Sequence, residues 1–289
     1  MGKSLYEQDT RARELFDRAD AVLGWSLSTI SFDGPEEVLR QTQNTQPAIF
    51  LHSVILARLV EHSNVVMAAG HSLGEYSALV YAGAMTLEDG LKIVRLRGEL
   101  MQRAGEETKG TMAAIIGLES AIVEEICNAA SDQGVVQCAN FNSPGQVVIS
   151  GSVNGVRRGM DLAKAGGARL VKELPVSGAF HSPLMESARE GLAAVLASTP
   201  IQDARVPVYA NVTARPVQKA KEIRTLLEAQ LTSPVRWEES VRNMTGDGAS
   251  AFIELGPGKV LQGLVKRIDA TVEVSGIDMY ADLTRIEHA

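Results

Sequence analysis

The chain has 289 residues and a formal net charge of −7, with 45% hydrophobic and 22% charged residues, a composition typical of one or two globular domains with a sizeable core. The acidic balance excludes a general nucleic-acid binder, which needs a basic face, and no apolar run approaches the ~18 residues that cross a membrane. The first residues lack a secretory apolar stretch, and the cysteines, Cys127 and Cys138, fit neither a disulfide framework nor a CxxC metal motif, so we expect a cytoplasmic protein.

Helices dominate the first third of the chain. Apolar side chains recur on one face of the first helix, and a loop rich in Ser, Gly and Pro separates it from the second, which Gln46 and Pro47 introduce. A short apolar run ending in Gly then predicts a buried parallel strand. The predicted elements are helix 6–23, helix 46–61, strand 65–70, helix 75–85 and helix 87–103.

The pattern changes over residues 110–176, where shorter elements alternate. Asn142-Ser143-Pro144-Gly145 predicts a turn between two strands, and Gly166-Gly167 ends a helix. The order is βαββαβ, which is that of a ferredoxin-like unit. The predicted elements are strand 111–118, helix 120–131, strands 135–141 and 146–152, helix 153–165 and strand 168–176.

Longer elements resume after this segment. They are helix 182–198, strand 206–211, helix 221–231, strand 251–256, helix 259–268 and strand 271–277. We therefore predict the α/β class, with a large parallel-sheet domain formed by residues 1–109 and 177–289. The ferredoxin-like subdomain, residues 110–176, is inserted into it. The mouth between the two is the expected place for a ligand.

Gly70-His71-Ser72-Leu73-Gly74 is a GxSxG motif between a predicted strand and a predicted helix. This is the context of a nucleophile elbow on a hydrolase-like α/β sheet. Without Cβ atoms at Gly70 and Gly74, strand and helix can converge while Ser72 adopts a strained, exposed conformation. The start of the helix adds positive potential and free N–H groups for an oxyanion. The alternative is an ordinary glycine-rich turn.

A serine nucleophile needs a base, and the chain offers five histidines. His71 adjoins the serine and would project away from it, and His288 is next to the frayed C-terminus. His52 and His62 occupy helical positions and are interpreted as structural or solvent-facing. His181 remains as the candidate base, at a strand-to-helix corner where it could instead be a structural cap.

Arg97 projects from an apolar helix face, since its neighbours one turn away are Ile93, Val94, Leu100 and Met101. A guanidinium that faces the interior needs a partner, because an unpaired buried charge is costly. That partner is either a structural carboxylate or a carboxylate of the substrate held by both arms of the fork. From the residues alone, the structural pair is favoured.

Taken together, the motifs resemble one family over nearly the whole chain. They are Gly70–Gly74, Arg97, Asn140–Gln146, Gly178–Pro183, Gln230 before Ser233-Pro234-Val235, and Glu254–Gly258. This set resembles malonyl-CoA:acyl-carrier-protein transacylase of fatty-acid synthesis, a transferase. The resemblance implies that malonyl-CoA and the phosphopantetheine arm of acyl carrier protein are the partners. It implies no metal or redox cofactor, and the acidic charge and the lack of a long apolar run argue against a nucleic-acid or membrane partner.

The resemblance also implies roles for single residues. Ser72 would carry the malonyl group, and His181 would act as base and then acid, oriented by the backbone carbonyl of Gln230. Arg97 would bind the malonyl carboxylate, and the N–H of Leu73 would be one oxyanion donor. The bulk of Phe180, beside the histidine, resembles the malonyl-selective variant of related acyltransferases.

The sequence departs from the family at its beginning. The family has a short strand and a GQGSQ loop, whose first Gln supplies a second oxyanion N–H, and these 289 residues contain no GQGSQ. We therefore expect the sheet to lack that strand, leaving neighbouring backbone groups unpaired or a groove. The oxyanion hole would then have one identifiable donor, Leu73.

Two rival functions stay open from the sequence. A serine acyl hydrolase, such as an esterase or thioesterase, shares GxSxG but would not need Arg97. An inactive carrier-protein binding module would fit the missing loop. The excess of basic side chains between Arg157 and Glu173 fits carrier docking or a solvated helix face equally. Asn211-Val212-Thr213 matches the N-glycosylation pattern, which we interpret as chance.

Overall fold

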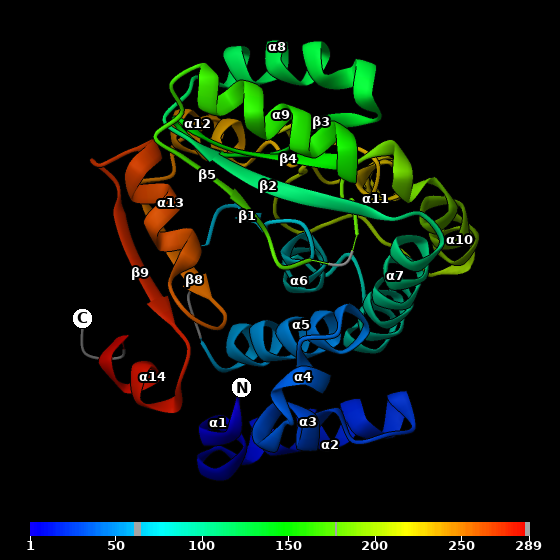
Figure 1. Cartoon of the computed structure of the whole chain (residues 1–289). Helices are drawn as coiled ribbons and strands as arrows, with labels where there is room; N and C mark the ends of the chain where they lie inside the picture. The colour runs from blue at the N-terminus through cyan, green and yellow to red at the C-terminus, as the bar shows by residue number, and fades with distance from the viewer. Residues whose placement is uncertain (61–64, 177, 287–289) are drawn as a thin grey trace.

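The computed structural model describes residues 1–60, 65–176 and 178–286, which form a mixed α/β fold. Its first part is a group of helices at one end of the molecule (Figure 1). Asp9 divides the predicted helix 6–23 in two, because its carboxylate accepts the N–H groups of Arg11 and Ala12 and so caps the second helix. The helices here are α1 (Lys3–Gln8), α2 (Thr10–Leu23), α3 (Leu27–Asp33), α4 (Glu36–Leu39) and α5 (Thr42–Leu59). The predicted loop before α5 is wrong, since it contains α3 and α4.

Pro47 lies inside α5 rather than at its start. A proline in a helix has no N–H to give, so the carbonyl four residues earlier, that of Gln43, loses its usual donor. Nη1 of Arg95 replaces that donor with a hydrogen bond of 3.0 Å to the Gln43 carbonyl. The proline therefore costs the helix less than it would in isolation.

The larger part of the molecule contains two small sheets. In the first, β1 (Ala68–Ala69) runs parallel to β6 (Val208–Tyr209), and β6 pairs antiparallel with β7 (Pro216–Val217). In the second, β8 (Ala251–Leu255) runs parallel to β9 (Glu273–Ile277). Within the described ranges, no ladder joins β1 to β8. The predicted strand 65–70 is thus much shorter than expected.

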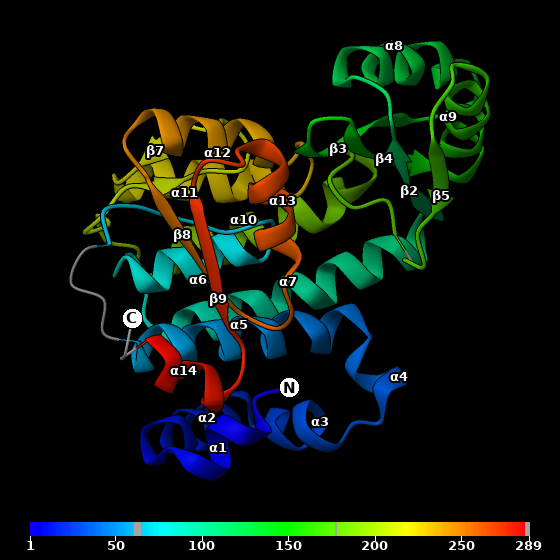
Figure 2. The same cartoon turned by 90° about the vertical axis from the view of Figure 1, so that its left-hand side faces the viewer.

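Strand β9 lies at the edge of the molecule, and helices pack beside these sheets (Figures 1 and 2). They are α6 (Gly74–Tyr81), α7 (Leu87–Glu107), the 3-10 turn η2 (Pro183–Met185), α10 (Glu186–Ser198), α11 (Ala220–Gln230), α12 (Trp237–Gly246), α13 (Val260–Ile268) and α14 (Tyr280–Ile286). The sequence patterns missed α12, α14 and strand β7. Of the helices described, none is both long and apolar enough to cross a membrane.

Residues 110–176 form a separate layer, confirming each element predicted there. The elements are β2 (Gly110–Ile116), α8 (Ser120–Ala130), the 3-10 turn η1 (Ser131–Gln133), β3 (Val136–Ser143), β4 (Gln146–Ser152), α9 (Val153–Ala165) and β5 (Leu170–Glu173). The antiparallel sheet has the order β3-β4-β2-β5. Helices α8 and α9 cover its outer face (Figures 1 and 2), around buried side chains such as Ile115, Val123 and Ile149.

The opposite face of this sheet packs toward the larger part. Met112, Ala139 and Val148 form a small buried cluster there, and Phe180 packs against both it and the main core. The main core lies among α2, α5, α6, α7 and α10. The segment that carries Phe180 and His181 is therefore clamped between the two layers, which fixes where its side chains point.

Candidate active site

Ser72 lies at a sharp corner between β1 and α6, as the GxSxG motif predicted. Its φ is +50°, in the left-handed region that non-glycine residues rarely adopt. A Cβ at Gly70 would overlap the backbone of Gly74, so the close approach of strand and helix requires glycine at position 70. A Cβ at Gly74 would meet no atom within 4 Å, so the expectation that both glycines are needed for space is wrong for Gly74.

The strained corner is held by Asn211, which the sequence patterns did not connect with the site. Its Oδ1 accepts the N–H of Ser72 at 2.6 Å, and its Nδ2 donates to the carbonyl of Gly70 at 2.8 Å. Asn211 follows β6 and is buried. Its amide is thus fully engaged inside the fold, which agrees with interpreting the glycosylation match as chance.

The structure brings Ser72 and His181 together across 109 positions of the chain. Oγ of Ser72 lies 2.8 Å from Nε2 of His181. On the other side of the ring, Nδ1 lies 3.0 Å from the carbonyl oxygen of Gln230 and 3.2 Å from that of Ser233. Because carbonyl oxygens only accept, the proton is on Nδ1 and the lone pair of Nε2 faces the serine.

The surroundings keep His181 neutral. The ring is buried, and this burial, followed by the positive charge of Arg97, lowers the pKa of His181 to about 3. A neutral imidazole can accept the serine proton at any pH near neutrality. The geometry is that of a nucleophile and a general base oriented by a backbone carbonyl rather than by a carboxylate.

The other histidines are engaged elsewhere or lie outside the described residues. Nε2 of His71 is 2.8 Å from Oδ1 of Asn142, and its ring packs on Trp237. Nε2 of His52 is 3.1 Å from Oδ1 of Asp278. His62 and His288 lie outside the described ranges.

Arg97 is 1% exposed and lies on the buried face of α7, as its apolar neighbours predicted. Its guanidinium donates to Oε1 of Gln46 at 2.6 Å, to Oε1 of Gln230 at 3.0 Å and to Oγ of Ser72 at 3.0 Å. It also lies over the ring of Tyr76, 5.6 Å from its centre.

These partners of Arg97 are all uncharged. Among the described residues, no carboxylate is in hydrogen-bond contact with the guanidinium, and its buried Nε has no partner. The structural carboxylate favoured from sequence alone is therefore not found in contact with Arg97. The arrangement leaves a buried cation beside Ser72, the candidate nucleophile, which suits an anionic substrate group.

The remaining candidates lie around this centre. Leu73 is the N-cap residue of α6, where backbone N–H groups have no acceptor within the helix. Gln230 ends α11 and reaches the site with both its carbonyl and its side chain. The half-buried Phe180 precedes His181. Sequence reasoning missed Gln46 and the side-chain role of Gln230, because buried amides have no signature of their own.

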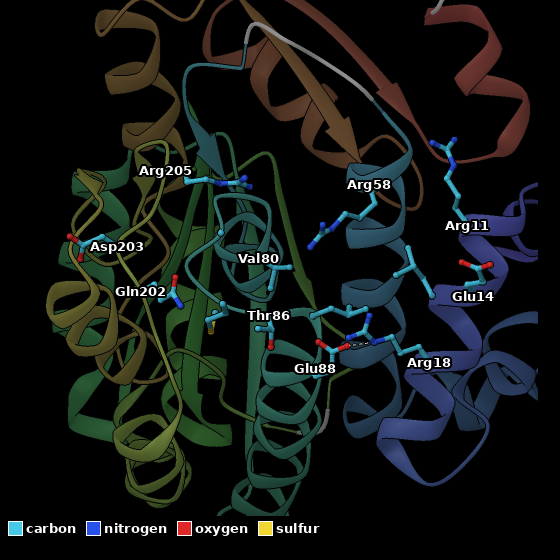
Figure 3. Close-up of a pocket in the computed structure, with 14 residues that line it drawn as sticks. Arg11, Glu14, Arg18, Arg58, Val80, Thr86, Glu88, Gln202, Asp203 and Arg205 are labelled. Carbon is cyan, nitrogen blue, oxygen red and sulfur yellow. Dashed lines mark ion pairs between the residues drawn. The ribbon is translucent and has the colours of Figure 1, made fainter.

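A cavity of about 700 Å³ lies away from these residues, lined by parts of α2, α5 and α7 (Figure 3). Four arginines line it, and Arg18 forms an ion pair with Glu88 there. None of its lining residues belongs to the site around Ser72. Across the described parts of the chain, no group of three or more His, Cys, Asp or Glu side chains is arranged to hold a metal ion.

Comparisons with known proteins agree with this chemistry. Residues 1–281 match the family model described as acyl transferase domain. The chain is 44% identical to malonyl CoA-acyl carrier protein transacylase of Bacillus subtilis (strain 168) over 280 residues, covering 96% of this chain and 88% of the relative. It is 43% identical to that of Escherichia coli (strain K12) over 268 residues, covering 92% and 87%.

Solved structures are similar over nearly the full chain. Malonyl CoA-acyl carrier protein transacylase of Coxiella burnetii has a TM-score of 0.96 at 40% identity, covering 99% of this chain and 92% of that one. A malonyl-transacylase solved in complex with its type II PKS acyl-carrier protein also has a TM-score of 0.96 at 40% identity, covering 100% and 95%.

Proposed function

Because the chain belongs to the family of acyl transferase domains, we propose that it transfers a malonyl group from malonyl-CoA to the phosphopantetheine thiol of an acyl carrier protein, through an ester on Ser72. The observation that carries this proposal is the contact between Arg97 and Ser72. A guanidinium held by neutral partners, 3.0 Å from the nucleophile, provides a site for a carboxylate beside a reacting carbonyl.

In the first half-reaction, Oγ of Ser72 attacks the thioester carbon of malonyl-CoA, and its proton passes to Nε2 of His181. The carbonyl oxygen becomes an oxyanion, for which the N–H of Leu73 is the assigned donor. The carbon–sulfur bond then breaks, and the sulfur of CoA leaves with the proton from His181. The products are CoA thiol, malonyl-Ser72 and a neutral imidazole.

The second half-reaction reverses these roles. The phosphopantetheine thiol gives its proton to His181, and its sulfur attacks the ester carbon on Ser72. When the carbon–oxygen bond breaks, Oγ takes the proton back. The malonyl group ends on the carrier thiol, and both enzyme residues return to their starting state. Throughout, the carbonyls of Gln230 and Ser233 stabilise the imidazolium that forms transiently.

We also infer that the chain is divided into a catalytic domain and an inserted subdomain. Residues 1–109 with 177–289 make a hydrolase-like catalytic domain, and residues 110–176 make an inserted ferredoxin-like subdomain. The strand order of that subdomain and its separate core support this assignment. The carrier's arm would enter between the two layers, where Phe180 lies. We expect the protein to work in the cytoplasm.

The rival functions are less well supported. An esterase or thioesterase has no use for a buried cation against its serine, and the relatives are named as transacylases. An inactive binding module has no use for a Ser72–His181 pair at 2.8 Å.

The test is to incubate the protein with malonyl-CoA and search for a malonyl adduct on Ser72 by mass spectrometry, then add holo acyl carrier protein. We expect the adduct to form, to move to the carrier thiol faster than it hydrolyses, and to be absent in Ser72→Ala. Hydrolysis without transfer would indicate the hydrolase, and no adduct would indicate the binding module.

A further inference from the structure

Glu75 is a buried carboxylate that the reaction above does not use. It lies in the first turn of α6, three residues after the nucleophile, and is 2% exposed. Its Oε2 accepts the backbone N–H of Asn211 at 3.1 Å and Nε2 of Gln230 at 2.8 Å. Burying an ionisable carboxyl group is costly, so its presence beside the reacting centre calls for a reason.

The amide of Gln230 connects Glu75 with the cation of the site. Its Nε2 donates to Glu75 and also to the carbonyl of Ser72 at 3.0 Å, while its Oε1 accepts Nη2 of Arg97 at 3.0 Å. The carboxylate can only accept from the NH₂ group, and the guanidinium can only donate to the oxygen. Glu75 and Arg97 therefore fix this amide in one orientation between opposite charges.

The same residue holds the catalytic base, because the backbone carbonyl of Gln230 accepts from Nδ1 of His181. A change in the charge of Glu75 would therefore alter its electrostatic interaction with Arg97. It would also alter the position of Gln230, which is hydrogen-bonded to both Arg97 and His181.

We propose that Glu75 is the internal counter-charge of Arg97 and a positioning residue for Gln230. When malonyl-CoA binds, its carboxylate replaces Glu75 as the counter-charge of Arg97, and Glu75 takes up a proton. The inference rests on the proposed function. The malonyl carboxylate brings a second negative charge to Arg97, which already interacts electrostatically with Glu75. Two carboxylates near one guanidinium cannot both stay charged at low cost in a buried site, so one takes up a proton.

The titration of Glu75 supports this. Burial raises the pKa of Glu75 to about 7, against the lowering effects of Asn211, Gln230 and Arg97. Arg97 from α7 is the ionisable group that lowers the pKa of Glu75, and the charge of Glu75 in turn raises the pKa of Tyr76 on α6. Burial lowers the pKa of the neighbouring His71 and His181, so both stay neutral around pH 7. Glu75 is thus the group in this network whose charge can change near neutrality.

The sign of the expected pH dependence follows. The carboxylate of bound malonyl raises the pKa of Glu75 further, so binding takes up protons and strengthens as the pH falls. Affinity for malonyl-CoA should increase about threefold to tenfold between pH 8.5 and pH 6.5. The affinity for acetyl-CoA, which has no carboxylate, should show no such increase beyond the titration of the phosphates that both ligands share.

The experiment is isothermal titration calorimetry on the Ser72→Ala protein, which cannot form the ester. Malonyl-CoA and acetyl-CoA are titrated near pH 7.5 in two buffers of different ionisation enthalpy, and the difference in heat gives the protons taken up. We expect malonyl-CoA to take up a fraction of a proton more than acetyl-CoA. Equal uptake for the two ligands would overturn the inference, whereas failure of malonyl-CoA to bind would overturn the proposed function itself.

Variants of Glu75 in the same background assign the proton. Glu75→Gln should abolish the extra uptake and reduce the pH dependence of malonyl-CoA binding to that of acetyl-CoA, while Glu75→Asp should retain the extra uptake. The matched control is Glu228→Gln, on the same helix as Gln230 but paired with Arg189, and it should leave uptake unchanged. Should Glu75→Gln fail to fold, Glu75→Asp decides: loss of the extra uptake in a folded Asp variant would contradict a role for the charge. Persistent uptake in a folded Gln variant would equally contradict it.

Discussion

Nη2 of Arg97 donates to Oγ of Ser72 at 3.0 Å, so the buried cation and the nucleophile are in direct contact. One methylene group separates the carboxylate carbon of malonyl from its thioester carbon. A ligand that places its carboxylate on Arg97 and its carbonyl on Ser72 must therefore be a short dicarboxylate derivative. The distance between these two residues thus limits both the charge and the length of the acyl group.

We predict that Arg97→Ala loses malonyl transfer and becomes relatively better with acetyl-CoA. The loss in kcat/KM for malonyl should correspond to about 2–5 kcal/mol, because the carboxylate would be desolvated without a partner. Initial rates with the two thioesters measure it. Arg103→Ala, an exposed arginine on the same helix, is the control and should leave the ratio unchanged. An equal loss for both substrates would make Arg97 a structural residue.

A second prediction concerns Phe180, which precedes the base and packs between the two layers. Its ring should crowd an α-methyl group, so the protein should prefer malonyl-CoA to methylmalonyl-CoA. Replacing it in Phe180→Ala should reduce that preference by about 1–3 kcal/mol, the usual worth of one methyl group. Competition between the two thioesters for the carrier thiol gives the ratio. An unchanged ratio in a folded, active variant would remove Phe180 from the selectivity.

Asn211 provides a third prediction. Removing its amide in Asn211→Ala leaves the N–H of Ser72 and the carbonyl of Gly70 without their partner, so the strained corner should relax. We expect stability to fall by about 1–3 kcal/mol and kcat to fall more than KM rises. Urea unfolding and steady-state kinetics measure the two effects. Thr213→Ala, exposed and two residues away, should change neither.

The buried histidines predict acid sensitivity. Burial lowers the pKa of His52, His71 and His181 from the ordinary 6.5, so the unfolded chain takes up their protons first and stability falls as the pH drops below 6.5. Glu75 acts oppositely, because its pKa is raised from 4.5 to about 7. The change at Glu75 offsets the effect of one histidine, and the other two histidines act in the same direction as His181, so stability should fall as the pH drops from 6.5 to 5.

Thermal unfolding at several pH values measures this loss. His181→Gln removes one of the three histidines and should make the fall in Tm shallower. An equally steep fall in that variant would show that His181 is not buried in its neutral form.

Segment 110–176 could be predicted closely because its strands and helices carry their own patterns, and several boundaries are marked by local signals such as Gly117 after β2 and Ser152, which caps α9. The case of β1 is different. Its length depends on which strands pair with it, and its ladder to β6 covers only Ala68 and Ala69. The short helices α3 and α4 have too few turns for a periodic pattern to show.

The same distinction holds for the site. Ser72 lies in a local motif, and Arg97 is a charged residue on an otherwise apolar helix face, so each can be identified from the sequence. Gln46, Glu75 and Asn211 do not, because each meets its partners only through contacts that span long stretches of chain, such as the 139 positions between Ser72 and Asn211. Such contacts follow from the fold and have no local pattern.

The parallel strand pair β1–β6 and the parallel strand pair β8–β9 belong to separate sheets, and this separation bears on the donors of the oxyanion hole. Strands of a parallel sheet are normally buried, yet Ile253 in β8 is 38% exposed, and Val66, two residues before β1, is 60% exposed. We propose that a strand with a GQGSQ loop, which the family resemblance associates with this place, would lie between the pairs and bring a second N–H donor beside that of Leu73.

Fusing such a segment ahead of Met1 should therefore raise the initial rate of malonyl transfer by about 10²–10³, the usual effect of one oxyanion donor. The rate, rather than the affinity for malonyl-CoA, should change, because an oxyanion donor acts on the transition state. A fused segment whose loop reads GPGSQ is the matched control, since the proline that replaces the first glutamine has no N–H to donate. It should restore the strand but not the rate. If the 289-residue chain already transfers malonyl as fast as the extended one, another donor fills the hole and the assignment of a single donor is wrong.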